Sequence, residues 1–497
     1  SRSAIPGLAR GVRFQLINGV AIYGGFAGTE ENLKERNPDP ATNGTVLSGD
    51  LNGDDLLGVG GSHATRGDNC FHVVEGSGTD SVAILDGFTI TGGRADGSRQ
   101  YDCGGGLYNY QGSPTITNCI FKNNSAKRCG GAIHNDYHSN PTLINCAFVG
   151  NAADEGGALH NFMNSNPILT NCMFAGNSAI QDGGAMCNRS CKPIMINCTF
   201  GGNSANGTGG GIYNVDSNPS LSNCILWGNR DGGDVVTTAQ IHNQGGMPVF
   251  KYCCIEDDVP GDGNVPAGEG NIDTDPLFVR DPDDGGDGWH SGDNDDFGNL
   301  HLKTGSPCID AANTALVSQD VIDLDNDGNR FEPVPLDLDL YPRFVDEPTT
   351  PDTGKDYPPI VDIGAYEYQP DCNRNGISDA CDIDCSSHDG RCDVPGCGSS
   401  GDCNHNGIPD ECEPDSDNDS VPDVCEFIYG DFDLDGDVDQ EDFGQLQACY
   451  SGSGETAEGG CEKADLNFDS TVDISDYKMF RNCMTGANMP ADPHCIN

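Results

Sequence analysis

Basic residues are scarce in this chain. Lysine and arginine together number 25, against 78 aspartate and glutamate residues, which gives a formal net charge of −53 at pH 7. Proteins that bind nucleic acid neutralise phosphates with lysine and arginine, so this charge balance excludes nucleic acid as an expected partner. It favours divalent cations, or a salty extracellular medium that screens the repulsion between carboxylates.

Long apolar segments are also missing. No run of 18 apolar residues occurs, so the sequence predicts no membrane-spanning helix. No initiator methionine or signal peptide is present, and we interpret Ser1 as a processed or truncated start. Cysteine is abundant, with 25 residues, which indicates an oxidising compartment. We therefore expect a secreted protein that is extracellular or held at a cell surface.

A repeat of 26 to 27 residues runs through the middle of the chain. It is marked by Asn-Cys pairs that begin at Asn118, Asn145, Asn171, Asn197 and Asn223. Glycine pairs, three apolar rows and two further asparagine rows keep the same period. A period of this length without helical patterning is typical of a solenoid. Local alternation of apolar and polar residues indicates about three short strands per repeat.

These repeats predict an all-β fold, a right-handed parallel β-helix solenoid. Equivalent residues then stack at roughly 4.8 Å per coil. We expect Phe121, Phe148, Phe174 and Phe200 to form one internal stack, and the asparagines to hydrogen-bond along the axis. The cysteine row from Cys119 to Cys224 is expected to point inward as small apolar side chains rather than to form disulfides.

The chain divides into four predicted segments. Residues 1–255 are the β-helix, residues 256–370 a closing module with acidic loops, residues 371–428 a cysteine- and aspartate-rich segment, and residues 429–497 a terminal calcium-binding domain. Composition shifts mark these boundaries, because regular repeats give way first to acidic glycine-rich loops and then to paired aspartates and cysteines.

Several motifs in the first 370 residues resemble a known family. They are Tyr23-Gly24-Gly25-Phe26, Leu47-Ser48-Gly49-Asp50, Asp275-Pro276-Leu277-Phe278, Gly305-Ser306-Pro307-Cys308-Ile309-Asp310 and Asp362-Ile363-Gly364-Ala365-Tyr366-Glu367. This part is similar to secreted bacterial β-helix proteins related to polymorphic outer-membrane protein repeats. The resemblance implies that the closing module, of the choice-of-anchor type, precedes an interchangeable surface-anchoring module. Further strand units usually precede the position of Tyr23 in that family, so we expect the first coil to be left open or the chain to have been cut.

Two aspartate-rich loops near the end have the spacing of EF-hand loops. Oxygen donors stand at positions 1, 3, 5, 7, 9 and 12, where they wrap around one Ca²⁺. The predicted ligands are Asp431, Asp433, Asp435, Asp437, Asp439 and Asp442, and, 34 residues later, Asp465, Asn467, Asp469, Thr471, Asp473 and Asp476. Aspartate at position 12, with an apolar helix after each loop, resembles a type I dockerin. Ser470 replaces the glycine expected at position 6, which predicts a weaker or strained second loop.

Three more aspartate loops precede this pair, and their spacing resembles thrombospondin type 3 repeats. The resemblance implies calcium ligands at Asp371, Asn373, Asn375, Asp379, Asp382, Asp402, Asn404, Asn406, Asp410, Glu413, Asp415, Asp417, Asp419, Asp423 and Glu426. Eight cysteines between 372 and 425 suggest that calcium and disulfides replace a hydrophobic core there. A similar loop with a less complete pattern starts at Asp323.

Cysteine spacing predicts particular pairs. Cys103 and Cys129 occupy the same position on adjacent coils, within reach of a disulfide. Cys449 with Cys461 and Cys483 with Cys495 repeat at the 34-residue offset, so two local disulfides are the simplest pairing. Cys187 and Cys191 are a further candidate pair that would close a short loop.

Catalytic candidates are few. Glu155 and Asp182 both precede the glycine pair, so they should stack on adjacent coils at roughly the 5 Å carboxyl separation of retaining glycosidases. The competing interpretation is a solvated turn row in which Arg128 neutralises Asp154. His134 and His160 lie between Tyr108 and Tyr213 on an outward row, which predicts either a sugar-binding aromatic strip or ordinary surface side chains.

Two classes of function follow. One is a non-enzymatic structural or adhesive cell-surface protein, a rigid rod with a calcium-ordered docking tail. The other is a carbohydrate-active enzyme, a polysaccharide lyase or glycosidase, docked through the same tail. The expected protein partner is either a cohesin-like receptor or the next copy of the chain, in which case head-to-tail contacts would build filaments.

Overall fold

The structure is a computed structural model. It describes residues 9–55, 64–232, 236–257, 267–291, 294–325, 327–347, 350–370, 379–383, 397–401, 409–412, 430, 432, 438, 440–452, 461, 464–467 and 470–484. The chain forms two compact units, one of residues 1–370 with 388–391 and one of residues 371–387 with 392–497. No helix among the described residues is both long and apolar enough to cross a bilayer.

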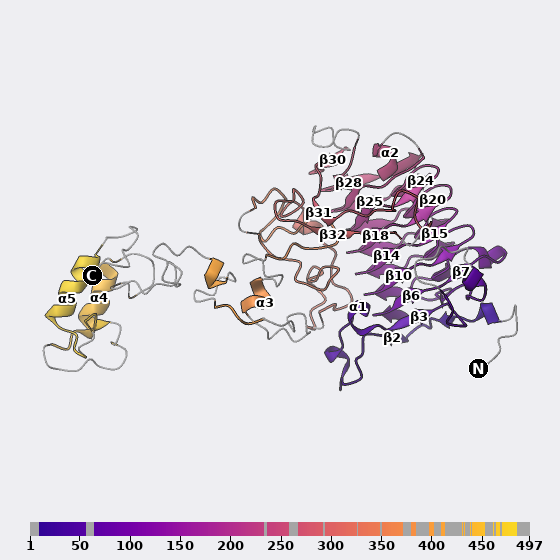
Figure 1. Ribbon diagram of the computed structural model, residues 1–497. Helices are drawn as coiled ribbons and strands as arrows, with labels where there is room; N and C mark the ends of the chain where they lie inside the picture. The colour runs from indigo at the N-terminus through magenta and orange to yellow at the C-terminus, as the bar shows by residue number, and fades with distance from the viewer. Residues whose placement is uncertain are drawn as a thin grey trace. The chain divides into compact units, whose positions relative to one another are not determined.

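The first unit is built on a parallel β-helix, and Figure 1 shows its strands stacked coil upon coil. One coil contains the strands Leu107–Tyr110, Thr115–Thr117, Ile120–Lys122 and Ser125–Ala126. The first three present Leu107, Ile116 and Phe121 to the interior, all fully buried. The fourth strand was not predicted, because two residues are too few for an alternation to be recognised.

Equivalent strands pair in parallel to form four sheets. Sheet A contains β1 (Phe14–Gln15), β4 (Val74–Glu75), β8 (Leu107–Tyr110), β12 (Ile133–Asp136), β16 (Leu159–Phe162), β20 (Met186–Arg189), β24 (Ile212–Val215) and β27 (Ile241–Gln244). Sheet B contains β2 (Ala21–Tyr23), β5 (Ile84–Asp86), β9 (Thr115–Thr117), β13 (Thr142–Ile144), β17 (Ile168–Thr170), β21 (Ile194–Ile196), β25 (Ser220–Ser222), β28 (Val249–Lys251) and β30 (Gly268–Glu269).

Sheet C contains β3 (Val46–Ser48), β6 (Thr89–Thr91), β10 (Ile120–Lys122), β14 (Ala147–Val149), β18 (Met173–Ala175), β22 (Thr199–Gly201), β26 (Ile225–Trp227) and β29 (Cys254–Ile255). Sheet D is the short one and contains β7 (Arg94–Ala95), β11 (Ser125–Ala126), β15 (Ala152–Ala153), β19 (Ser178–Ala179) and β23 (Ser204–Ala205). Paired strands continue to β30, beyond residue 255.

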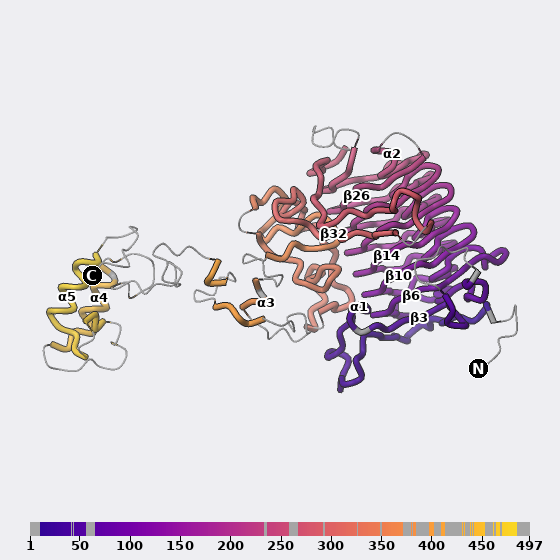
Figure 2. Tube along the Cα trace, viewed as in Figure 1, coloured from indigo at the N-terminus to yellow at the C-terminus, as the bar shows by residue number. Residues whose placement is uncertain are grey.

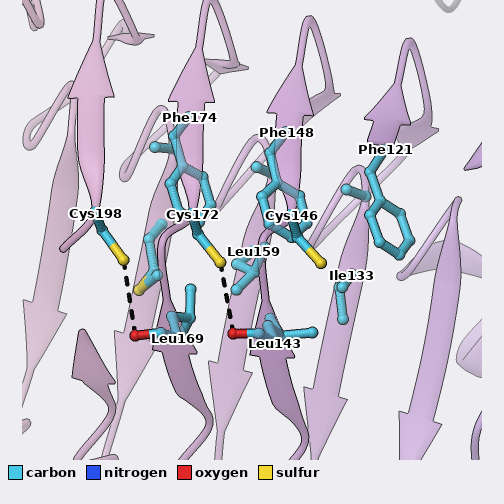
Figure 3. Packing of buried hydrophobic residues seen from close by; sticks show 14 of the residues in the cluster. Phe121, Ile133, Leu143, Cys146, Phe148, Leu159, Leu169, Cys172, Phe174 and Cys198 are labelled. Carbon is cyan, nitrogen blue, oxygen red and sulfur yellow. Dashed lines mark hydrogen bonds between the residues drawn. The ribbon is translucent and has the colours of Figure 1, made fainter. Parts of the chain in front are cut away.

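Aromatic side chains fill the core in the predicted register. Phe121, Phe148, Phe174 and Phe200 are fully buried, and successive ring centroids are 5.2, 4.6 and 4.5 Å apart. Figure 3 shows the first three rings in line, with the thiols of the cysteine row beside them. These thiols are free and donate to carbonyls of the neighbouring coil, as Cys172 does to Leu143 over 3.6 Å. Both predictions for the core are therefore confirmed.

Asparagine ladders run along the helix axis, also as predicted. The amide of Asn135 donates to Asn161 over 2.9 Å, and Asn161 donates to Asn188 over 2.8 Å. A second ladder links Asn124, Asn151, Asn177, Asn203 and Asn229. All these side chains are buried, so each ladder supplies hydrogen bonds that its side-chain amides would otherwise lack.

Residues 275–368 lie along one side of the coils, where Figure 2 shows this segment as a separate layer beside the stack. We call it the flank. It includes the antiparallel pair β31 (Phe278–Arg280) and β32 (Asn299–Leu302). The Asn-Cys turns hold it, because Asn145 donates to the Asp337 carbonyl over 2.9 Å and Asn171 donates to the Leu336 carbonyl over 2.7 Å. The asparagines of these turns adopt positive φ, which asparagine tolerates better than most residues.

Two side chains of the flank, one fully and one partly buried, fit the repeats closely. The Arg343 guanidinium is fully buried and donates to the Asn171 amide oxygen over 3.1 Å and to the Ala365 carbonyl over 2.6 Å. Phe297 lies against Gly176, where an added Cβ would come within 2.4 Å of the ring. Only glycine fits at this turn, because it also has a φ of +60°. The outer face of sheet C is thus covered by the chain itself.

The remaining helices are short. In the first unit these are η1 (Ala9–Gly11), η2 (Leu33–Glu35), α1 (Pro40–Asn43), η3 (Ala64–Gly67), η4 (Arg99–Asp102), α2 (Val236–Gln240) and η5 (Thr314–Leu316). The described helices of the second unit are α3 (Asp379–Ile383), η6 (Asp410–Cys412), α4 (Gln440–Cys449) and α5 (Ile474–Cys483).

Candidate functional site

One column of side chains on the outer face of sheet A carries most of the predicted catalytic chemistry. Strand pairing places Tyr108, His134, His160, Cys187 and Tyr213 in register on successive coils. The column faces away from the core as predicted, but the two histidines are only 4% exposed. Neighbouring rings cover them, since the His134 and His160 ring centroids are 5.1 Å apart and Tyr108 lies 5.7 Å from His134.

Glu155 lies at the edge of this column and is held by a base from the next coil. Arg189 binds it through two contacts, Nε to Oε2 at 3.0 Å and Nη2 to Oε1 at 2.9 Å. His160 Nε2 lies 3.5 Å from the same Oε2. The hydrogen bond from His160, followed by the contact with Arg189, lowers the pKa of Glu155 to about 2. Glu155 is therefore a carboxylate at neutral pH and cannot act as a general acid.

The two histidines form a chain of imidazoles. Their Nδ1 atoms are 3.2 Å apart, and burial lowers the pKa of both rings. Because Glu155 can only accept, we infer that His160 carries its proton on Nε2 and accepts from His134 at Nδ1. The His160 Nε2 proton and the His134 Nδ1 proton then each have an acceptor, as expected for a hydrogen-bond network with a structural role.

Asp182 lies one coil from Glu155, as predicted, because the Gly156 amide donates to the Asp182 carbonyl over 3.0 Å. Its carboxylate nevertheless has its own partners. Asp182 Oδ1 accepts from the Thr208 amide over 2.9 Å and from the Thr208 hydroxyl over 3.0 Å. The two candidate catalytic carboxylates therefore have different hydrogen-bond partners, Arg189 for Glu155 and Thr208 for Asp182.

Three neighbouring contacts complete this face. Cys103 and Cys129 form the predicted disulfide across adjacent coils. Arg128 lies 3.6 Å from Asp102, so the predicted neutralisation of Asp154 by Arg128 is wrong. The reason is the turn, in which the Arg128 amide donates to the Asp102 carbonyl over 2.8 Å and brings the two side chains together.

The predicted pairing of Cys187 with Cys191 is also wrong. Both thiols are free and buried. Cys187 lies inside β20, whereas Cys191 follows the strand and joins a different column, where its amide donates to the Ser217 hydroxyl over 3.0 Å. Arg189, which lies between them, was missed by sequence analysis. The spacing of 34 residues between Glu155 and Arg189 could have indicated this pair, because it equals one coil plus the offset between turn and strand.

A cavity of about 570 Å³ lies over sheet D, next to the flank loop that carries Trp289. Its lining includes the bases Arg94 and Lys127 and the acids Asp96, Asp154 and Asp287. Burial raises the pKa of Asp154, as does the charge of Glu155 beside it. A carboxyl near bases and a tryptophan is chemically suited to contact a sugar.

In the second unit, α4 and α5 pack on each other as a duplicated pair. Leu446 of α4 and Phe480 of α5 are buried in one core with Val438 and Val472. Phe443 lies 5.8 Å from Tyr477, its equivalent in the duplication. The apolar residues that correspond across the 34-residue offset therefore pack in one core.

The described residues of the second predicted calcium loop adopt a tight turn. The Ser470 amide donates to Asp465 Oδ2 over 2.6 Å, and Ser470 has a φ of +72°, the strained conformation predicted for this position. Asp473 caps α5 by accepting from the Ser475 amide over 2.7 Å, and Asp476 Oδ2 accepts from the Asp473 amide over 2.7 Å. Asn467 donates its amide to Asp476 Oδ1 over 3.2 Å.

Among the ligands predicted for the first loop, the described residue is Asp442. It is 1% exposed, and its Oδ1 accepts from the Phe432 amide over 2.6 Å. The position-12 carboxylates Asp442 and Asp476 are therefore both buried and both reach back over the start of their own loops. The predicted ligands Asp431, Asp433, Asp435, Asp437, Asp439 and Asp469 lie outside the described residues.

The predicted calcium repeats before this domain are described in part. Asp379 and Asp382 lie on α3 and are buried, and Asp410 lies in η6. Their predicted co-ligands Asp371, Asn373, Asn375, Asp402, Asn404, Asn406, Glu413, Asp415, Asp417, Asp419, Asp423 and Glu426 lie outside the described residues. The Cys449–Cys461 disulfide is confirmed. Cys483 is disulfide-bonded, and its predicted partner Cys495 lies outside the described residues.

Comparison with known proteins identifies the fold. Residues 73–245 match the family model described as the right handed beta helix region. No curated protein and no solved structure matches the chain. The match covers the regular coils, so it supports the right-handed β-helix and assigns no chemistry to the column on sheet A or to the second unit.

Proposed function

We propose that the chain is a non-enzymatic structural or adhesive protein of the extracellular space, in which the β-helix is a rigid scaffold and the second unit is a calcium-ordered docking module. The observation that carries this proposal is the duplication in the second unit. Asp442 and Asp476 stand at the same loop position, each at the start of one helix of a shared apolar core. Calcium is the ion of choice, because the predicted ligands are hard oxygen donors.

The solenoid supports a scaffold role because the polar groups of its candidate catalytic column bind one another or the backbone. Glu155, His160 and Arg189 satisfy one another, and Asp182 is engaged by Thr208. The asparagine ladders continue from coil to coil, and the aromatic stack runs from Phe121 to Phe200. A repeat in which every coil bonds to its neighbours resists bending and gives a stiff element for a surface structure.

An apolar groove on the second unit suits a protein partner. It has a volume of about 430 Å³ and is lined by Phe443, Leu446, Gln447, Tyr450, Ile474 and Tyr477. Tyr450 and Ile474 are each 51% exposed, so the groove leaves apolar surface open to solvent. The partner we propose is a cohesin-like receptor or a second copy of the chain, and the charge of −53 fits a calcium-rich extracellular setting.

The assembly state of the full chain tests this proposal. Light scattering and electron microscopy would be carried out in millimolar calcium and again after chelation. Particles that lengthen in calcium and dissociate on chelation support self-assembly. Single particles that capture a cohesin-like receptor only in calcium support a separate receptor. Single particles that bind no such receptor in either condition contradict a docking tail.

The carbohydrate-active alternative has one observation in its favour, the cavity over sheet D beside Trp289. If this cavity binds acidic or neutral polysaccharide, Lys127→Ala and Asp154→Asn should weaken binding to a glycan array or abolish release of reducing ends. Lys192→Ala is a suitable control, since its backbone contacts Asn166 on another face of the coils. Release of reducing ends that survives both cavity substitutions would reject this site.

A further inference from the structure

Three aspartates of the flank lie close together, and none of them belongs to a predicted calcium loop. Asp310 lies in a turn after β32, and Asp346 and Asp352 come from a later loop. One carboxylate oxygen of each lies within 4.8 Å of the others. Asp346 and Asp352 are exposed, whereas Asp310 is completely buried. The cluster therefore has a closed inner side and an open outer side.

Oδ1 and Oδ2 of Asp310 are buried, and neither makes a hydrogen bond of good geometry. The Glu347 backbone amide is a donor near this carboxyl, and it only partly offsets the rise in its pKa. Its main chain is fully used, because its amide donates to Asp362 over 2.8 Å and its carbonyl accepts from the Thr353 and Gly354 amides over 2.9 and 3.0 Å. A buried carboxylate without well-formed hydrogen bonds is among the costliest groups in a protein, so this one requires an explanation.

The acidic side chains around Asp310 destabilise its ionised form further. Asp346, Asp352 and Glu347 all face Asp310, and burial together with these charges raises its pKa to about 7. Nearby bases are engaged elsewhere. Lys355 binds Glu269 at 2.5 Å, and Arg343 binds Glu367 at 3.3 Å. The Asp310 oxygens thus face a pocket of negative potential that a cation would neutralise.

We propose that Asp310, Asp346 and Asp352 bind one calcium ion in the flank, independently of the loops of the second unit. Ligand oxygens lie roughly 2.3 to 2.6 Å from Ca²⁺, so oxygens on opposite sides of one ion are up to about 5 Å apart. Three carboxylate oxygens that all lie within 4.8 Å of one another fit a single coordination sphere. All donors are carboxylate oxygens, which suit calcium better than zinc, and the exposed side leaves room for water ligands.

The ion would fasten the flank to the coils. Asp310 is three residues from Asn313, whose amide donates to Asn223 Oδ1 over 3.0 Å, and Asn223 in turn donates to the Asn313 carbonyl over 3.1 Å. Bringing Asp346 and Asp352 onto Asp310 joins the outer loop to this anchored turn. Calcium therefore stabilises the layer that covers sheet C, a role separate from docking.

Ion counting on the full chain tests the site. After chelation and equilibrium dialysis against CaCl₂, the Asp352→Asn variant should bind one calcium ion fewer than the unsubstituted chain. Asp352 is exposed, so this substitution leaves the core intact. Asp356→Asn, an exposed aspartate of the same loop, is the matched control and should bind the full number of ions. The loops of the second unit are unchanged in both variants.

Hydrogen exchange gives an independent readout. In the unsubstituted chain, calcium should slow exchange of the Thr353 and Gly354 amides, which bond to the Asp310 carbonyl, by at least tenfold. In Asp352→Asn this slowing should disappear, while calcium protection of α5 persists. An unchanged ion count together with unchanged exchange at these two amides would overturn the proposal. If calcium protects the Thr353 and Gly354 amides of the unsubstituted chain but not α5, the result counts against the docking module and not against this site.

Discussion

Asn151 donates from Nδ2 to the Oδ1 of Asn177 over 3.0 Å, and the backbone amide of Asn151 donates to the same oxygen over 3.0 Å. Asn177 Nδ2 in turn donates to the Phe148 carbonyl over 2.8 Å. One side chain therefore satisfies three buried groups of the preceding coil.

This relationship predicts a large effect of Asn177→Ala. The substitution removes the acceptor of the Asn151 backbone amide, one of the two acceptors of Asn151 Nδ2, and a donor to the Phe148 carbonyl, all in a buried site. We expect the free energy of unfolding of the solenoid to fall by about 3 to 5 kcal/mol, measured by denaturant titration. Asn140→Ala is the control, because Asn140 is an exposed asparagine of the preceding coil, and it should cost less than about 1 kcal/mol. Equal costs for the two variants would contradict the ladder.

The ion pair of Glu155 and Arg189 predicts a second effect. Arg189→Met keeps the aliphatic contacts but leaves a partly buried carboxylate with His160 as its nearest donor. A loss of about 1 to 3 kcal/mol is expected in the free energy of unfolding. Arg280→Met removes a pair with Asp296 whose side chains are 57% and 43% exposed, and it should change stability by less than about 1 kcal/mol. A larger loss for Arg280→Met would show that burial does not govern these pairs.

Buried histidines predict how stability depends on pH. Burial lowers the pKa of His72 to about 4, below the ordinary value near 6.5. The contribution of neutral His72 to the free energy of unfolding is fully present above pH 6.5. It is lost as the pH falls toward 4, because the unfolded chain binds the proton first. Denaturant midpoints should therefore drop between pH 7 and 5, with His72 contributing roughly 2 kcal/mol at pH 5. His72→Gln should remove that share, and an unchanged pH profile in this variant would contradict the assignment.

A further loss of stability should follow in stronger acid. The pKa of Glu155 is lowered to about 2, so its contribution is present above about pH 4.5 and disappears as the pH falls through 2. Glu155→Gln should flatten the profile in this window and leave the share of His72 unchanged, although it also removes a group that raises the pKa of His160.

Cysteine mapping tests the core directly. Peptide mapping of the oxidised chain should find Cys103 joined to Cys129, whereas Cys119, Cys172 and Cys224 should be free thiols. Burial raises the pKa of these three thiols, so iodoacetamide should modify them only after denaturation. Rapid alkylation of the native chain would place the row outside the core.

Repetition explains why much of the fold could be predicted. Phe148 alone says little, but Phe121, Phe174 and Phe200 at a constant period fix both the register and the inward direction of the row. The same argument found the asparagine ladders and the Cys103–Cys129 disulfide. It failed for Cys187 and Cys191, which are close in sequence yet belong to different columns.

Residues outside the repeat could not be placed in this way. Nothing periodic links Arg343 to Asn171, or Phe297 to Gly176, so the packing of the flank on sheet C had no sequence signal. The burial of His134 and His160 was also missed, because strand alternation gives the direction of a side chain but not what covers it. In the second unit, the spacing of Asp465 to Asp476 predicts ligands, while their oxygen positions depend on the ion itself.

The central claim is that calcium orders the second unit without being needed for the coils. Hydrogen exchange of the full chain in millimolar calcium and in chelator tests it most directly. We predict that amides of α4 and α5 are protected only in calcium, that Asp435→Ala and Asp476→Ala abolish this protection, and that β14, β18 and β22 remain protected throughout. Equal protection of α4 and α5 with and without calcium would contradict the account.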